Sequence, residues 1–382
     1  MNILLITPGI NKTFNDNYQS YRYIADNNND VLAISNKEST AKGGSLHKDL
    51  EVEVDGSLVI HRVFNTKREQ QSFLRRLPYK KKLKNLVSEF RPDVIFCEEI
   101  SNLRLALEMK REYGVPVILR TEFAFNSNYP YRSMGRLLKI FKNPLTGDRL
   151  ASAVGGLIWR WAYSKVDSVI SCFHEDVTKE PKVNNTPFYY VPWPTFHPKI
   201  EGETKRRKDR AVFIGAFESH KNIPELLVTI PELLQKTPLK EFCFVGGGSD
   251  LGVIEQLKAS YPDSITHIQS LSREECLKLI RDSFFAYSPA TRGGWGFVGD
   301  SWAMQTPIIL THNHYGFCDD IDSVVATPQD IANRVNSLYK NESEFDRVRM
   351  GGYKRYVENH AADAIGARFL EICLLTCTKF SE

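Results

Sequence analysis

Short apolar runs and amphipathic stretches alternate along the chain. In the first half, runs such as Ile3–Thr7, Val31–Ser35 and Asp93–Cys97 are separated by stretches with helical periodicity. Apolar runs of this length are typical of strands buried on both faces, and their alternation with helices predicts a parallel sheet. We expect further strands at Leu58–Phe64, Pro116–Thr121 and Val166–Ser171, and helices at Tyr18–Ala25, Arg75–Phe90, Leu103–Tyr113, Arg132–Phe141 and Arg149–Lys165.

A proline-rich stretch interrupts this alternation, which then starts again. Residues Asn184–Lys208 hold four prolines and a charged run, which predicts a linker. Beyond it we expect strands at Ala211–Ile214, Phe242–Val245, Ile265–Ile268, Phe284–Tyr287, Ile308–Leu310 and Val324–Ala326. The intervening and following helices are expected at Ile223–Leu234, Val253–Ala259, Arg273–Asp282, Trp302–Met304, Pro328–Tyr339, Glu342–Asn359 and Ala362–Thr378. The pattern predicts two doubly wound, Rossmann-like α/β domains, with a ligand site in the cleft between them.

Composition and charge narrow the class of protein. The chain has 382 residues, which fits two domains, and its hydrophobic content of 42% is that of an ordinary globular protein. The net charge of +4 is too small to argue for nucleic-acid binding. Seven cysteines are scattered without paired spacing, which favours a reducing compartment. We therefore expect a cytoplasmic protein with no nucleic-acid partner.

Positive charge is concentrated in two segments of the first half. Residues 67–91 carry nine Lys and Arg against two Glu. Residues 131–143 mix four cations with five apolar side chains, as a basic amphipathic helix does. Such segments bind anionic membrane surfaces, so peripheral contact with the inner face of the membrane is expected here.

Several segments of the second half share the order and spacing of a known motif set. They are Val212–Asn222, Phe244–Gly248, Ile268–Glu275, and Tyr287–Val298 with the following Asp300–Pro307. Together they resemble the donor-binding domain of GT-B glycosyltransferases, most of all the retaining family 4, also called glycosyl transferases group 1. The resemblance implies a GT-B fold: an acceptor domain at residues 1–195, a donor domain at 196–358, and a helix at 359–382 that crosses back to the first domain.

The same resemblance implies an activity. The chain would transfer a sugar from a nucleotide-sugar donor to a hydroxyl acceptor, with retention of configuration. A glycan or lipid-linked saccharide in bacterial surface-polysaccharide assembly is the expected acceptor. The nucleotide sugar is a co-substrate of unknown base, and neither a metal nor another cofactor is expected.

The expected site chemistry centres on the donor diphosphate. Glycines and a helix N-terminus let backbone N–H groups approach the phosphates, and the Lys221 ammonium would neutralise charge on the leaving group. Asp300 would accept the ribose hydroxyls. Glu122, at the end of a strand, is the candidate for contact with the sugar or for a general base, with Glu98 and Glu99 as alternatives. The donor-binding residues would be Gly9, Gly215, His220, Lys221, Ile268, Leu271, Arg292, Gly293, Gly294, Trp295, Gly296, Phe297 and Asp300.

Departures from the family pattern leave other functions open. Ala216 stands where the family has Arg, and the first Glu of the Glu-x7-Glu motif is replaced by Gly293 or Arg292. A non-catalytic relative that binds or stabilises a partner, and a nucleotide-sugar 2-epimerase, are therefore alternatives. A nicotinamide enzyme is disfavoured because Leu251 occupies the third glycine position of the dinucleotide fingerprint. His312-x-His314 with nearby acidic and thiol groups is expected to be a polar loop in preference to a metal site.

Overall fold

The chain folds into two compact units, seen in a computed structural model. The structure describes residues 1–10, 16–38, 51–121, 160–172, 186–195, 204–291, 295–313 and 319–382. One unit comprises Met1–Pro194 together with Ala362–Glu382, and the other comprises Thr195–Ala361. The chain enters and leaves the second unit side by side, because Thr195 N–H donates to the His360 carbonyl at 3.0 Å and Thr195 pairs with Ala361.

The first unit is built on a sheet of eight strands in the order β3-β4-β2-β1-β5-β6-β7-β8. All neighbours pair in parallel except β3, which runs antiparallel to β4. Two edge strands, β3 and β8, were not expected from the sequence, and β8 lies within the predicted linker. The strands are β1 Asn2–Ile6, β2 Asp30–Asn36, β3 Val52–Asp55, β4 Leu58–Phe64, β5 Val94–Glu98, β6 Val117–Thr121, β7 Ser168–Ser171 and β8 Phe188–Tyr190.

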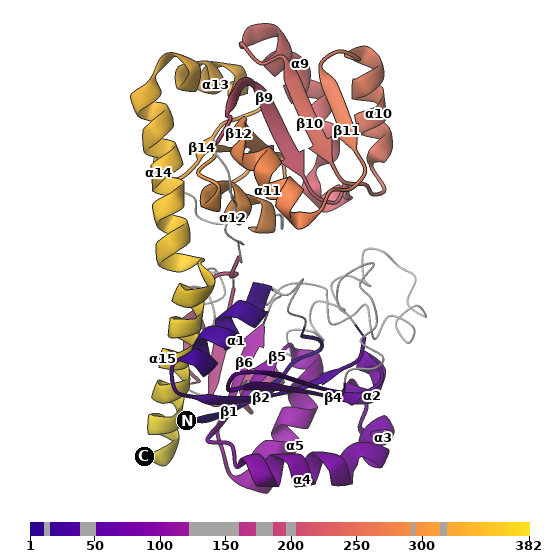
Figure 1. The fold of residues 1–382 in the computed structure, drawn as a ribbon, viewed down its shortest axis with the longest axis vertical. Coiled ribbons are helices and arrows are strands. Elements are labelled where there is room, and N and C mark those ends of the chain that lie inside the picture. Colours follow the sequence, from indigo (N-terminus) through magenta and orange to yellow (C-terminus); the bar gives the residue numbers. More distant parts are fainter. Residues whose placement is uncertain are drawn as a thin grey trace. The chain divides into compact units, whose positions relative to one another are not determined.

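Helices cover both faces of this sheet (Figure 1). Helices α1 (Asp16–Asp26) and α15 (Ala362–Ser381) pack on one face, where Tyr21 and Phe369 are buried against the strands. Helices α4 (Lys80–Phe90) and α5 (Leu103–Tyr113) bury Val87 and Leu105 on the other. Two separate apolar cores therefore sandwich the sheet.

The basic segment is not the single helix Arg75–Phe90 that the sequence suggested. It consists of α2 (Lys67–Gln71), α3 (Phe73–Arg76), a 3-10 turn η1 (Leu77–Tyr79) and α4. Pro78 lies in the turn, because proline lacks an N–H donor and is disfavoured inside a helix. A capping box of Thr66 and Glu69 starts α2.

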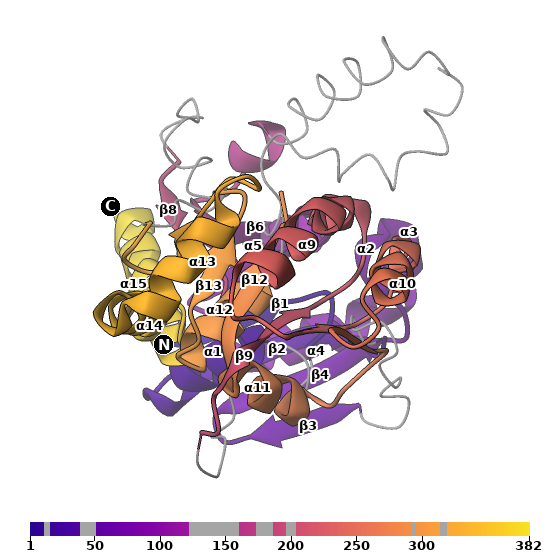
Figure 2. The same cartoon turned by 90° about the horizontal axis from the view of Figure 1, so that it is seen from above.

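The second unit is built on a fully parallel sheet in the order β11-β10-β9-β12-β13-β14. Helices α9 and α13 lie on one side of it and α11 on the other (Figure 2). The strands are β9 Arg207–Ile214, β10 Glu241–Val245, β11 Ile265–Ile268, β12 Ser283–Ser288, β13 Ile308–Leu310 and β14 Val324–Val325. The helices and 3-10 turns are η3 Ser219–Lys221, η4 Ile223–Glu225, α9 Leu226–Lys236, α10 Leu251–Ser260, α11 Arg273–Arg281, α12 Trp295–Ala303, α13 Ile331–Lys340 and α14 Glu342–Asn359; in the first unit η2 spans Ile100–Asn102.

Membrane-spanning structure is not seen in the part of the chain described. None of its helices combines the length and the apolar composition needed to cross a bilayer.

Candidate functional site

The carboxyl ends of β9, β10 and β11 are tied together by their backbones. Gly215 N–H donates to the Val245 carbonyl, and Gly246 N–H donates to the Ile268 carbonyl, both at 3.0 Å. Phe217 N–H donates to the Gly247 carbonyl at 3.0 Å. The three loops that follow these strands therefore form one continuous rim, the edge at which parallel sheets bind ligands.

The glycines of the 246–248 segment serve this backbone packing. Gly246 has φ +136°, and a Cβ atom there would lie 2.0 Å from the Gly215 carbonyl oxygen. A Cβ on Gly248 would lie 2.3 Å from the Phe217 carbonyl oxygen. Both clashes are with backbone, so these two positions require glycine for loop contact whether or not a phosphate is near.

Lys221 ends the η3 turn on this rim. Its backbone N–H donates to the Glu218 carbonyl at 2.8 Å, and Asn222 follows with a left-handed φ of 51°. The side chain is half-buried, and that burial lowers the pKa of the Lys221 ammonium to about 8. Within the described residues no carboxylate lies within 4 Å of it. The site thus holds a desolvated cation whose charge an incoming anion would stabilise.

A polar cluster anchors the segment that carries Lys221. The Glu225 carboxylate accepts hydrogen bonds from Asn222 Nδ2 at 2.8 Å and from Thr311 Oγ1. His312 Nε2 lies 3.0 Å from the same carboxylate. Thr311 and His312 directly follow β13, so Glu225 ties the η3–η4 segment to a second strand end. Sequence reasoning missed Glu225, because two of its partners, Thr311 and His312, lie 86 and 87 residues further along the chain.

The same cluster includes His312, one of the two histidines of the possible metal site. His312 is engaged with Glu225 and Asn222, while residues 314–318 lie outside the described part of the chain. Within the described residues, no group of three or more His, Cys, Asp and Glu side chains is arranged to hold a metal ion.

Asp300 lies in α12, which starts after the glycine-rich segment. Its side chain is only 7% exposed, and both carboxylate oxygens accept from the Arg273 guanidinium, with Nη2 to Oδ1 at 2.6 Å. Arg273 opens α11, beside the end of β11, and is itself 43% exposed. Arg273 was not among the predicted site residues.

The neighbouring aromatic residues are structural in this fold. Trp295 is buried with its ring centroid 4.3 Å from that of His360, and Phe297 is buried with its ring 5.6 Å from that of Phe213. Their side chains therefore pack in the core of this unit, and their predicted role in donor binding stays a prediction. Gly296, between them, is exposed at the start of α12.

The remaining predicted donor residues fall into two groups. Ile268 and Leu271 are half-buried on the rim, where the Ile268 carbonyl already accepts the Gly246 N–H. Arg292, Gly293 and Gly294 lie outside the described residues, as does the side chain of His220.

In the first unit, the Gly9 loop is held by a buried polar network. Thr7 Oγ1 bonds to the backbone of Gly9, and Gln70 Nε2 donates to the Thr7 carbonyl at 2.8 Å. Asn36 Nδ2 donates to Gln70 Oε1 at 2.7 Å and also to the Pro8 carbonyl. The loop after β1 is thus fixed by side chains from β2 and α2, which the sequence did not indicate.

The acidic candidates of the first unit are engaged in ion pairs. Glu98 is buried, and its carboxylate accepts from Arg120 at 2.9 Å and from the Tyr21 hydroxyl. Glu99 pairs with Lys67 at 3.2 Å. Glu122 lies outside the described residues, so its predicted role stays a prediction.

Comparison with known proteins agrees with the second-unit motifs. Residues 198–355 match the family described as glycosyl transferases group 1. An uncharacterized glycosyltransferase, YqgM, from Bacillus subtilis (strain 168) is 22% identical over 193 residues, which are 48% of this chain and 54% of that protein. The match thus spans about half the length of this curated relative.

Solved structures resemble the whole chain in fold. Sucrose-phosphate synthase from Thermosynechococcus elongatus superposes with a TM-score of 0.67 at 14% identity, covering 97% of each chain. The Anabaena protein HepE, solved with UDP, gives a TM-score of 0.65 at 11% identity over 97% of this chain and 99% of its own. A trehalose-6-phosphate synthase gives 0.67 at 11% identity over 98% and 99%. These likenesses confirm the predicted fold class, two α/β units of the GT-B type; the cleft expected between them stays a prediction.

Proposed function

We propose that the chain is a retaining glycosyltransferase that moves a sugar from a nucleotide-sugar donor to a hydroxyl acceptor. The donor diphosphate would bind on the rim of the Thr195–Ala361 unit, at Lys221 and the exposed start of α12. The observation that carries the proposal is the half-buried Lys221 ammonium, which lies on a rim built from the motifs of a glycosyltransferase family.

The proposed chemistry uses charge stabilisation by the protein. As the bond between the anomeric carbon and the diphosphate oxygen breaks, negative charge grows on the leaving nucleoside diphosphate. A cation positioned in a desolvated site stabilises that charge more than water does. Asp300, oriented by Arg273, would accept the ribose hydroxyls. The acceptor hydroxyl would bond to the anomeric carbon and give its proton to an oxygen of the leaving diphosphate.

The donor and acceptor classes are proposed on separate grounds. The Anabaena neighbour was solved with UDP and with UDP-glucose, so uridine nucleotides are the first donors to test. A glycan or lipid-linked saccharide of bacterial surface-polysaccharide assembly remains the proposed acceptor, in a cytoplasmic protein that contacts the inner face of the membrane.

Calorimetry tests the donor site directly. The full chain would be titrated with UDP, GDP, dTDP and CMP and with their sugar conjugates. We expect one nucleotide series to bind, and Lys221→Met to weaken it about 10- to 100-fold, the magnitude of a lost hydrogen bond to a charged group. Lys258→Met, an exposed lysine of α10, is the matched control and should bind as the wild type does.

Two outcomes would count against the proposal. If no nucleotide binds, the transferase function is wrong and a non-catalytic, partner-binding relative becomes the better hypothesis. If a donor binds but no nucleoside diphosphate is released with any glycan acceptor, the nucleotide-sugar 2-epimerase is tested next by following the sugar configuration.

A further inference from the structure

The short helix α3 buries a charged side chain and exposes its apolar ones, the reverse of an ordinary surface helix. Its only buried side chain is Arg76, which donates to the Gln70 carbonyl at 2.9 Å and to Glu108 at 2.8 Å. Its apolar side chains are exposed instead: Leu74 is 73% exposed, and Phe73 is 42% exposed with the Arg104 guanidinium 4.7 Å from its ring centroid. Leu77, in the following turn, is 51% exposed. Large apolar side chains grouped in this way mark an interaction surface.

Unpaired positive charge lies next to these three side chains. Arg75, Lys80 and Lys81 are exposed, and within the described residues no carboxylate lies within 4 Å of any of them. By contrast, Arg76 pairs with Glu108 at 2.8 Å and Lys84 pairs with Glu112 at 2.9 Å. The free cations and the exposed apolar groups thus occupy the same ten residues, 73–82.

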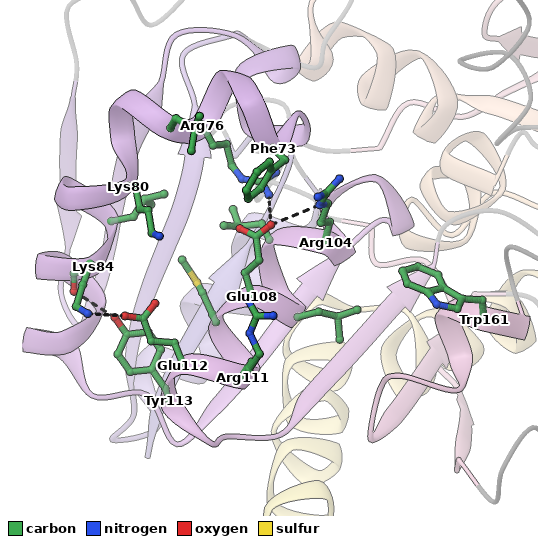
Figure 3. A pocket seen from close by; sticks show the side chains of 15 residues that line it. Phe73, Arg76, Lys80, Lys84, Arg104, Glu108, Arg111, Glu112, Tyr113 and Trp161 are labelled. Carbon is green, nitrogen blue, oxygen red and sulfur yellow. Dashed lines mark hydrogen bonds and ion pairs between the residues drawn. The ribbon is translucent and has the colours of Figure 1, made fainter. Parts of the chain in front are cut away.

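An open groove extends this surface between α4 and α5 (Figure 3). Its volume is about 950 Å³, and its floor includes Leu83, Leu105 and Met109. Trp161, 51% exposed, lies at its rim. The charged side chains that line it are five cations and two carboxylates: Arg76, Lys80, Lys84, Arg104 and Arg111, with Glu108 and Glu112.

We propose that this surface, made of α3, η1 and the start of α4, docks the protein on an anionic lipid bilayer. Phe73, Leu74 and Leu77 would insert among the acyl chains at the interface, while Arg75, Lys80 and Lys81 meet the headgroups. The charge identifies the occupant, because a net-positive rim around exposed apolar groups complements an anionic leaflet. The surface lies within the first unit and does not depend on the donor site or on glycosyl transfer.

Vesicle sedimentation of the full chain, without nucleotide, tests the docking surface. We expect the protein to bind vesicles of phosphatidylcholine mixed with phosphatidylglycerol. Its affinity for vesicles of phosphatidylcholine alone should be at least about tenfold lower. In the double variant Lys80→Gln with Lys81→Gln, the affinity for the anionic vesicles should fall about fivefold for each charge removed. Most of the salt dependence of binding should also disappear. In the double variant Leu74→Ser with Leu77→Ser, the affinity for the same vesicles should fall about tenfold or more. All four positions are exposed, so the fold is retained.

A matched variant in the second unit distinguishes binding through this surface from non-specific binding of the protein to vesicles. Val228→Ser with Lys258→Gln removes an exposed apolar group and an exposed cation of the same kinds, and should bind vesicles as the wild type does. Equal binding to both vesicle types, or equal losses in this control, would overturn the proposal. Binding of soluble glycerol phosphate without vesicle binding would also overturn it, in favour of a small-anion site. Nucleotide affinity is measured separately, so the transferase function and this surface can fail independently.

Discussion

At the scale of single residues, the charge state of Lys221 makes the donor site pH-sensitive. Its pKa of about 8 lies below the ordinary 10.5, so the free folded protein loses this proton as the pH rises through 8. A bound diphosphate favours the charged form and raises the pKa again. Above pH 8, nucleotide binding should therefore take up a proton, and affinity should fall by up to about tenfold per pH unit.

Calorimetry in buffers of different ionisation enthalpy measures this proton directly. The apparent binding enthalpy above pH 8 should vary with the buffer for the wild type and not for Lys221→Met. Buffer dependence that persists in Lys221→Met would assign the proton to another group. Binding without proton uptake in the wild type would mean that Lys221 does not meet the diphosphate.

The pairing of Asp300 with Arg273 leads to a second prediction at this scale. Arg273→Ala leaves a carboxylate that is 7% exposed without its cation, which should lower the free energy of unfolding by about 1–3 kcal/mol. Chemical denaturation measures this loss. Asp300→Asn combined with Arg273→Ala should be far from additive, because the two groups act as a unit.

An exposed ion pair on α11 serves as the comparison for the pair formed by the buried Asp300 and Arg273. Lys278 and Glu274 are 44% and 62% exposed, so Lys278→Ala should cost under about 0.5 kcal/mol. Additive effects of the Asp300 and Arg273 changes would show that the pair seen here does not hold in solution.

At the scale of elements, the sequence predicted the strands that are buried on both faces. β1, β5 and β12 are largely apolar runs, as parallel strands covered by helices on both sides require. The edge strand β3 escaped notice, because its half-exposed Val-Glu-Val-Asp sequence lacks such a run. The glycines drew attention to the loops after β9 and β10, and their role in donor binding stays a prediction. Arg273 and Glu225 make contacts between distant segments, which no local pattern encodes.

The two adjacent glycines of the β10 loop allow a test of the rim. A Cβ on Gly246 would meet backbone at 2.0 Å with φ at +136°, while a Cβ on Gly247 would meet nothing within 4 Å. Gly246→Ala should lower the free energy of unfolding by about 2–3 kcal/mol or more, as strained backbone substitutions do. Gly247→Ala should change it by about 0.5 kcal/mol or less, and equal losses in denaturant titrations would contradict the packing described.

At the scale of the whole molecule, the first unit is discontinuous in sequence. Its core is completed by α15, which buries Phe369 against Tyr21 and Phe96. The second unit is one continuous segment, Thr195–Ala361. During synthesis the whole of the second unit therefore emerges before α15, the helix that completes the core of the first.

This division predicts that a destabilising substitution in α15 lowers the stability of the first unit only. Phe369→Ala removes a fully buried ring and should destabilise that unit by about 3–5 kcal/mol, whereas Leu374→Ala, 53% exposed on the same helix, should change its stability by under about 0.5 kcal/mol. Hydrogen exchange followed by mass spectrometry should show faster exchange in α1 and β5 of Phe369→Ala and unchanged exchange in β9 to β12. Equal acceleration in both units would mean that they unfold together, because a unit with its own core resists opening in its neighbour.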